Sequence, residues 1–316
     1  MIADDVGNLK IRPLTPELLD HAMRKLNEDP KRREADVQAI RDWLKKQAHI
    51  VGQPDDQMII TFLRGCKFSL ERTKEKLDMY YTIKTMVPEL FKNRNLKKNE
   101  VLQEILKLGF FFPVGEDDEG RKVYVMVGGK DEPGKYKVED VMKVNFMMMD
   151  HIMMHDDVSV IKGTVNVMDM AQMKMAHATQ MMPSFIKKIT VCSEEGYPFR
   201  PQGMNFINMA SFLNTIFKLF QSFSKEKINR RTFVHGKDLE SLYKKVPRKS
   251  LPKEYGGDAG SVDDLAKDFV DKILAFNDWF VADEKNGVDE KKRTGKSKTQ
   301  QDLFGMEGSF RQLNLD

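Results

Sequence analysis

After about Val101 the sequence alternates between short β-rich runs and longer helical patterns, and this alternation constrains the fold more than any other feature. Residues 123–127 (VYVMV) form a continuous apolar run, which is typical of a strand buried on both faces. Further strands are predicted at residues 163–170, 204–209 and 231–236, and a helical pattern separates each from the next. Such an order indicates an α/β fold with a mixed, largely parallel sheet flanked by helices.

The remainder of the chain divides into two other regions. Residues 1–100 carry helical patterns and no strand pattern, so we predict a small all-helical domain there. Residues 101–283 are then the α/β domain. Residues 284–316 are predicted to be a polar linker, disordered over residues 284–302, followed by a more apolar end that docks back on the body.

Bulk composition limits the class of protein. A chain of 316 residues with 41% hydrophobic and 32% charged residues is expected to be globular and soluble. It has no run of about 18 apolar residues and no secretory signal at its start, so any membrane contact should be peripheral. Two cysteines do not make a disulfide framework, which favours a reducing, cytoplasmic location. We expect a monomer.

One amphipathic stretch follows the 204–209 strand directly. Its apolar residues recur at helical spacing and share one face, while the opposite face is polar but nearly uncharged. A helix of this kind suits a movable cover over an apolar pocket. The stripe consists of Met209, Phe212, Leu213, Ile216, Phe217, Phe220 and Phe223.

Cations follow this stripe at once, at Lys225, Lys227, Arg230 and Arg231. Residues 200–253 contain twelve Lys and Arg but three Asp and Glu, against a net charge of +4 for the whole chain. This asymmetry indicates an anionic partner, although a solvated basic surface is the alternative. Apolar and cationic residues are separate rather than interleaved, which favours a membrane surface over nucleic acid.

Methionine is unusually frequent, with 21 residues in the chain and six of them in residues 142–154. Methionine is flexible and polarizable, so it suits the wall of an adaptable cavity, but it is also common as core filler. The sequence leaves both interpretations open.

Motifs for catalysis are missing or weak. The sequence contains no GxGxxG after a strand, no GxxxxGK[ST], no GxSxG and no HExxH. Cys66 and Arg72 have the spacing of a phosphatase loop, but no glycine lies between them. His151 and His155 have a metal-compatible spacing without an evident third ligand. We therefore expect that the protein is not an enzyme and that it binds no metal or cofactor. A lipid-modifying hydrolase is the less favoured alternative.

Several segments, taken in order, resemble the CRAL-TRIO family of lipid-transfer proteins. They are DDQMIITFLRGCKFSLERTKEKL, GTVNVMDM, AHATQMMPSFIKKI, GYPFRPQGMNFINMASFLNTIF, EKINRRTFVHG and LPKEYGG. The resemblance implies a five- or six-stranded sheet as the floor of an apolar cavity. It also implies a movable helical gate from about Ile207 to Phe223.

Resemblance and periodicity together give a candidate ligand pocket: Phe146, Met149, Met153, Val167, Cys192, Phe199, Phe206, Ile207, Phe212, Leu213, Ile216, Phe217 and Phe220. The family's phosphoinositide head-group positions fall on Arg200, Gln202, Lys227 and Arg231. Gln202 is neutral, and Lys225 and Arg230 are candidates to compensate for it.

The implied function is the binding and transfer of a tocopherol-, retinoid-, carotenoid- or other isoprenoid-like lipid. Its release is expected at phosphoinositide-containing membranes, with transient peripheral association. The alternative is a phospholipid or phosphoinositide sensor that presents a bound lipid to other proteins.

Overall fold

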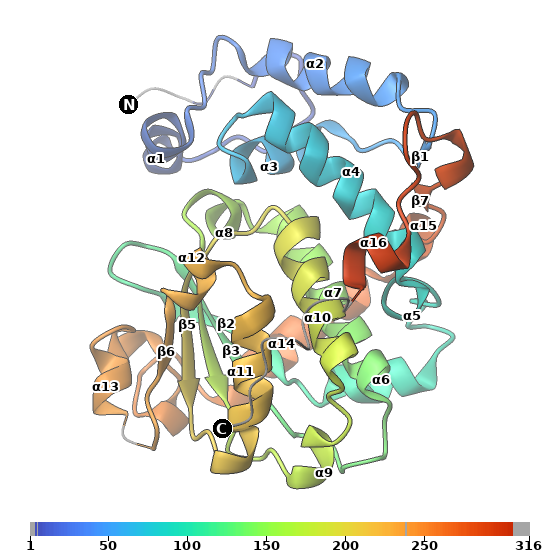
Figure 1. Cartoon of the computed structure of the whole chain (residues 1–316). Coiled ribbons are helices and arrows are strands. Elements are labelled where there is room, and N and C mark those ends of the chain that lie inside the picture. The colour runs from blue at the N-terminus through green and yellow to red at the C-terminus, as the bar shows by residue number, and fades with distance from the viewer. Residues whose placement is uncertain (1–3, 5, 238, 306–316) are drawn as a thin grey trace.

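The computed structural model describes residues 4, 6–237 and 239–305, and Figure 1 shows a helical N-terminal region beside an α/β body. The N-terminal helices are α1 (Pro16–Leu26), α2 (Arg33–Lys45), α3 (Asp56–Gly65), α4 (Leu70–Met86) and α5 (Pro88–Phe91). Side-chain caps explain where two of them begin. The Thr15 hydroxyl accepts from the Leu18 N–H, and Asp55 accepts from the Met58 N–H.

Five strands form the main sheet, in the order β2-β3-β4-β5-β6. They are β2 (Phe111–Glu116), β3 (Lys122–Val127), β4 (Thr164–Asp169), β5 (Pro201–Ile207) and β6 (Thr232–Val234). A short turn joins β2 to β3, and this pair is antiparallel. Helical crossovers join the later strands, and their pairs are parallel. The predicted mixed, largely parallel sheet is confirmed.

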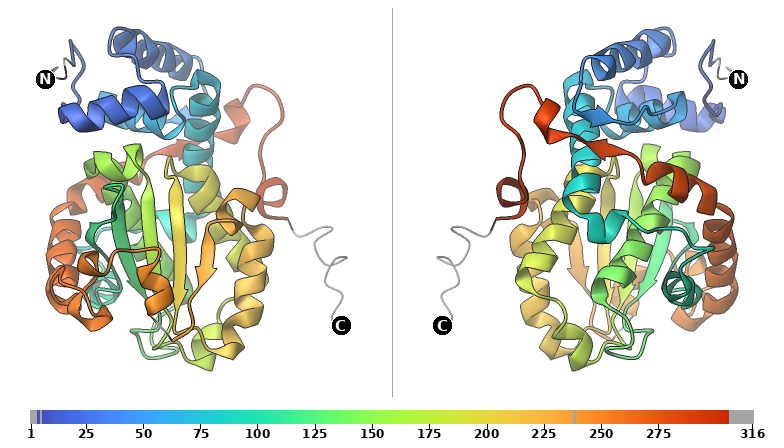
Figure 2. Two further views of the ribbon diagram at one scale, coloured as in Figure 1. Left: turned by 90° about the vertical axis from the view of Figure 1, so that its left-hand side faces the viewer. Right: turned by 90° about the vertical axis from the view of Figure 1, so that its right-hand side faces the viewer.

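Helices cover both faces of this sheet (Figure 2). On one side lie α7 (Val138–His155), α10 (Pro183–Val191) and α11 (Asn214–Phe223). On the other lies α13 (Glu240–Tyr243), whose Leu242 belongs to one buried cluster with Val167 and Ile207 of the strands. The shorter helices of the body are α8 (Asp157–Ile161), α9 (Met175–Ala178) and α12 (Glu226–Asn229). In the described part of the chain, no helix is long and apolar enough to cross a membrane.

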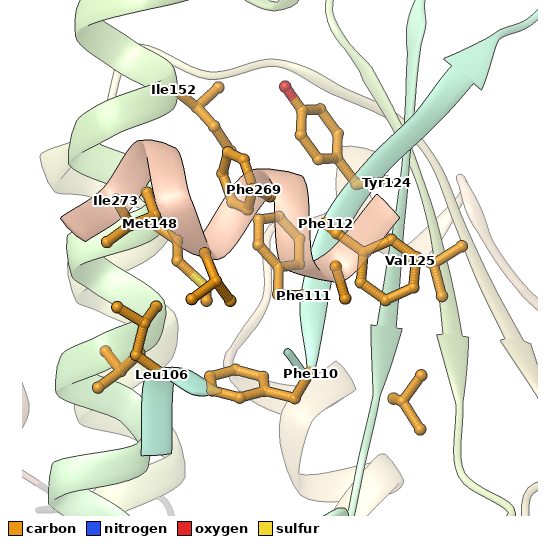
Figure 3. Close-up of a cluster of buried hydrophobic side chains, with 14 of the residues drawn as sticks. Leu106, Phe110, Phe111, Phe112, Tyr124, Val125, Met148, Ile152, Phe269 and Ile273 are labelled. Atoms are coloured by element: carbon orange, nitrogen blue, oxygen red, sulfur yellow. The ribbon is translucent and has the colours of Figure 1, made fainter. Parts of the chain in front are cut away.

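A dense apolar cluster joins α6 (Glu100–Lys107) and α14 (Val262–Ala275) to the sheet edge, as Figure 3 shows. The Phe111 ring stacks on the Tyr124 ring with centroids 5.3 Å apart, and Phe269 of α14 meets Phe111 edge-on. This packing holds β2 and β3 against α7 and fixes one wall of the body.

The segment after α15 (Asn277–Asp283) returns to the N-terminal helices. Its strand β7 (Gly287–Val288) pairs antiparallel with β1 (Ile50–Val51), and α16 (Gln300–Phe304) packs against α10. The prediction of disorder for residues 284–302 is therefore wrong, and so is the expectation that the first 100 residues lack a strand. Asp78 of α4 explains the order, because Arg293 and Lys298 both bind its carboxylate. Residues 306–316, part of the predicted docking end, lie outside the described residues.

A buried charge cluster fastens the helical region to the body. Arg94 binds Asp150 of α7, with Nη1 2.6 Å from Oδ2, and also binds Asp283. Lys84 of α4 binds Asp283 as well. All four side chains are almost completely buried, so each charge depends on its partners rather than on water.

Candidate functional site

A cavity of about 1060 Å³ lies between the sheet and helices α7, α10 and α11. The sheet supplies its floor through alternate residues, because side chains on one face of a strand recur with a period of two. These floor residues are Tyr124 and Met126 of β3, Thr164, Asn166 and Met168 of β4, and Met204 and Phe206 of β5.

The structure brings a majority of the sequence-predicted pocket residues to this cavity. They come from α7, from the segment before β5, from β5 itself and from the predicted gate. They are Phe146, Met149, Phe199, Phe206, Leu213, Ile216, Phe217 and Phe220.

Five other predicted pocket residues lie outside the lining. Val167 and Ile207 occupy the alternate positions of their strands and belong to the core cluster that includes α13. Met153 and Cys192 are buried in the core that α3 and α4 share with the body. Phe212 lies in a 3-10 turn at the start of the gate and misses the cavity.

Sequence reasoning missed several methionines of the lining, namely Met79, Met126, Met168, Met170, Met173, Met181 and Met204, whereas it had placed Met209 in the stripe that covers the pocket. Alternate residues of a strand share a face, so one known floor residue on β3, β4 or β5 would have identified the methionines of that strand that line the cavity. The run at residues 142–154 serves both roles that the sequence allowed. Met142 and Met149 line the cavity, whereas Met147 and Met148 are core residues.

The predicted gate corresponds to a 3-10 turn at Ser211–Leu213 followed by α11, so it begins later than Ile207, which ends β5. No residue of α11 is fully buried, although Ile216, Phe217 and Phe220 face the cavity. The Phe217 ring meets Phe206 of the floor with centroids 5.0 Å apart. The amphipathic helix α11 thus covers the cavity with its apolar face and exposes its polar face.

Several cations line the cavity, and one group of them surrounds Lys227 closely enough for their charges to interact: Lys67, Arg72, Arg200 and Arg231. We call this group, together with Lys227, the cationic mouth. Lys67 and Arg72 belong to the α3–α4 region, so the helical region and the body build the mouth together. Burial lowers the pKa of Lys227, and the neighbouring charges of Arg231, Lys67, Arg200 and Arg72 lower it further.

Two of the mouth cations also have structural partners. Arg200 donates to the Val160 carbonyl at 2.8 Å, and burial lowers the pKa of its guanidinium to about 10. Arg231 donates to the Pro201 carbonyl at 2.7 Å. Within the described residues, no carboxylate lies within 4.0 Å of the side-chain nitrogens of Lys67, Arg72 or Lys227, so their charges are available to an anion.

Of the other predicted head-group residues, Lys225 also lines the cavity, whereas Gln202 and Arg230 do not. Lys225 forms an ion pair with Glu195 at 2.7 Å, and Arg230 forms one with Glu226 of its own helix. Gln202 is absent from the lining and packs against Gly163 instead. Sequence reasoning did not include Lys67 and Arg72, which line the cavity beside Lys227.

Comparison with known proteins decides the family. Residues 106–257 match the CRAL/TRIO domain, and residues 29–101 match the Pinta-like UBA domain. The alpha-tocopherol transfer protein-like protein of Homo sapiens is 31% identical over 270 residues, covering 85% of this chain and 77% of that protein. This chain belongs to the CRAL/TRIO family.

Two more distant likenesses are also found. Clavesin-2 of Homo sapiens is 27% identical over 246 residues, covering 77% of this chain and 75% of that protein. The crystal structure of Sfh5 gives a TM-score of 0.48 at 14% identity, covering 94% of this chain and 98% of that one. CRAL/TRIO membership indicates hydrophobic lipid binding, and the family is generally non-enzymatic.

The two possible catalytic groupings have structural explanations in this CRAL/TRIO chain. Cys66 ends α3, its Sγ donates to the Arg72 carbonyl at 3.5 Å, and burial raises the pKa of its thiol. The thiolate is the nucleophilic form of cysteine, and burial disfavours it at this position. His151 and His155 stack with ring centroids 4.5 Å apart, and no metal-binding cluster of His, Cys, Asp and Glu occurs among the described residues.

Proposed function

We propose that this protein encloses a hydrophobic small molecule in the cavity and releases it at phosphoinositide-containing membranes when α11 opens. The observation that carries the proposal is the continuity of an apolar cavity with the cationic mouth, since one set of lining residues includes both. A ligand reservoir and a site for an anionic head group would then lie in one continuous cavity. The protein would be cytoplasmic and associate with membranes transiently.

The lid supports a closed carrier in water. An open α11 would expose Ile216, Phe217 and Phe220, and each Å² of apolar surface in water costs about 25 cal/mol. Against acyl chains the same exposure carries no such cost. An anionic lipid can shift the lid only by binding the open state more tightly than the closed state.

The mouth supplies the attraction that docking requires. A basic residue close to an anionic membrane surface contributes about 1 kcal/mol, so Lys67, Arg72 and Lys227 together give a few kcal/mol. That is enough for reversible docking and too little for permanent attachment.

The ligand is proposed to be tocopherol-, retinoid-, carotenoid- or otherwise isoprenoid-like. The most similar relatives quoted above carry tocopherol transfer in their name, and the methionine-rich wall adapts to several shapes. Mass spectrometry of lipid extracted from the purified protein identifies the ligand directly.

The membrane step is tested with purified protein, a labelled isoprenoid and liposomes with or without phosphatidylinositol bisphosphate. We expect faster transfer to liposomes that contain it, and slower transfer by the Lys227→Glu/Arg231→Glu variant. Lys107→Glu/Lys267→Glu is a matched control, because it makes the same charge change at exposed positions on α6 and α14. Equal transfer to both liposomes would contradict the phosphoinositide role.

A phospholipid sensor is the second candidate, and the continuous cavity supports it too. A two-tailed phospholipid could place its tails in the cavity and its head group among the mouth cations. Native mass spectrometry separates the two functions. A bound phospholipid that resists exchange favours the sensor, whereas an exchangeable isoprenoid favours the carrier.

A further inference from the structure

Two asparagine side chains stand among the apolar residues of the lining. Asn166 lies on the floor, in β4, and Asn145 lies on α7. The Asn145 NH₂ group donates to Met149 Sδ at 3.7 Å, and the Asn166 NH₂ group donates to Met204 Sδ at 3.4 Å. A thioether is a weak acceptor, so both NH₂ groups are poorly matched within the protein.

The side-chain carbonyl oxygens of both residues are matched even more poorly than the NH₂ groups. Among the described residues, no hydrogen-bond donor reaches Oδ1 of Asn145 or Oδ1 of Asn166. A second contact of the Asn166 NH₂ group, to Thr164 Oγ1, is long at 3.4 Å. Neighbouring Asn205, outside the lining, shows the contrast, because it donates to the Asn166 main-chain carbonyl at 3.2 Å and pairs its Oδ1 with His235 at 3.0 Å.

Asn145 is buried and Asn166 is half-buried, and an amide group that stays unmatched once a ligand excludes water from the cavity costs about 1–3 kcal/mol. Such groups in a binding cavity usually mark the polar contacts that orient a ligand. A hydroxyl satisfies both needs of an amide at once, because it donates to an Oδ1 and accepts from an NH₂. A carboxylate or phosphate would be held better by the cationic mouth, which lies elsewhere on the lining.

We propose that Asn145 and Asn166 select a ligand with a neutral hydrogen-bonding group, a hydroxyl above all, over a pure hydrocarbon. This inference rests on the proposed function, since it concerns the ligand of the same cavity. Asn166 makes the stronger case, because it stands between Thr164 and Met168 on a floor that is otherwise rich in methionine.

The strand register also gives the ligand a direction. Thr164 pairs with Pro201 at the end of the sheet nearest Arg200 and the cationic mouth, whereas Met168 pairs with Phe206 towards the opposite end. Beyond Met168 the lining continues through Met170 and Met173. The polar end of the ligand therefore points to the mouth, and its apolar tail extends towards the methionine-rich end.

Displacement of diphenylhexatriene, a neutral probe that fluoresces in apolar cavities, tests this inference on the full chain. The two competitors are phytol and phytane, which share a 20-carbon isoprenoid skeleton and differ mainly in the hydroxyl. We expect phytol to compete about five- to tenfold better, the factor that one net hydrogen bond supplies. Asn166→Val and Asn145→Leu should each reduce that preference and leave phytane competition almost unchanged.

Met168→Leu is the matched control, because it alters the same floor without removing an amide, and it should affect both competitors alike. Asn166→Ser keeps a hydrogen-bonding group, so partial retention of the preference guards against misfolding of the valine variant. Equal competition by phytol and phytane in the wild type overturns the inference and leaves lipid carriage intact. Failure of the protein to bind diphenylhexatriene at all overturns the proposed function itself.

Discussion

Replacing Asp150 by Asn should destabilise the protein strongly, because Asp150 is the centre of the buried charge cluster. Its carboxylate accepts from Arg94 at 2.6 Å, from the Tyr197 hydroxyl at 2.8 Å and from the Tyr80 hydroxyl at 3.3 Å. Asparagine has nearly the same shape, so the change removes a charge without opening a cavity. Arg94 and Lys84 would then share the single negative charge of Asp283.

The size of the effect follows from burial. Breaking a fully buried ion pair costs about 3–5 kcal/mol, because the remaining charge has no water to solvate it. A typical protein has only about 5–15 kcal/mol of stability in total. For a chain of this size we expect the melting temperature to fall by roughly 10 °C.

Urea unfolding followed by circular dichroism at pH 7 measures the change in the free energy of unfolding. The control is Asp278→Asn, which removes an ion pair of similar length, 2.8 Å, whose Lys97 and Asp278 side chains are 67% and 83% exposed. Exposed pairs contribute about 0–1 kcal/mol. A loss for Asp150→Asn no larger than that of the control would refute the reasoning. The double variant Arg94→Met/Asp150→Leu should lose less stability than Asp150→Asn, because it leaves fewer unpaired charges.

Three further outcomes follow from the structure. Gly65→Ala should lower stability by about 1–3 kcal/mol in thermal unfolding, because a Cβ there would lie 2.3 Å from the Pro198 carbonyl oxygen; an unchanged melting temperature would contradict this close approach. Burial lowers the pKa of His151 to about 4, so the unfolded chain takes up a proton near pH 6.5 before the folded chain does, and stability should fall from pH 6.5 towards pH 4. His151→Phe should flatten that part of the stability-against-pH curve, and an identical slope would count against it. Burial raises the pKa of Asp78, but hydrogen bonds from its cationic partners outweigh this and leave the pKa below its usual value. The resulting stabilisation is present above about pH 3.8 and is lost as the pH falls through the folded-state pKa, so Asp78→Asn at pH 7 should speed hydrogen exchange in residues 290–304, and unchanged protection would exclude this tie.

Local patterns predicted the elements well, because each depends on neighbouring residues. The alternation of strands and helices predicted the parallel part of the sheet, and the stripe from Met209 predicted the helix that covers the cavity. The cavity lining was harder to predict, because local patterns do not show which face of a strand points into the cavity. In a strand apolar on both faces, such as β4, nothing shows whether Asn166 or Val167 faces the cavity.

Long-range partners account for the remaining failures. Lys67 and Arg72 reach the mouth only because the helical region packs on the edge of the body near α12, as Figure 1 shows. The polar composition of residues 284–302 also led to a wrong prediction of disorder. Their order comes from partners such as Asp78, 215 residues away from Arg293, that no local window includes.

The ion pairs between α4 and the segment near the end of the chain have a consequence for folding during synthesis. Asp78 leaves the ribosome 215 residues before Arg293, and Lys84 leaves 199 residues before Asp283. At about 5–20 residues per second, α4 waits for roughly 10–40 s with its buried charges unmatched. An early helix is therefore among the last to be completed, and until then its unmatched surface is open to chaperones and proteases.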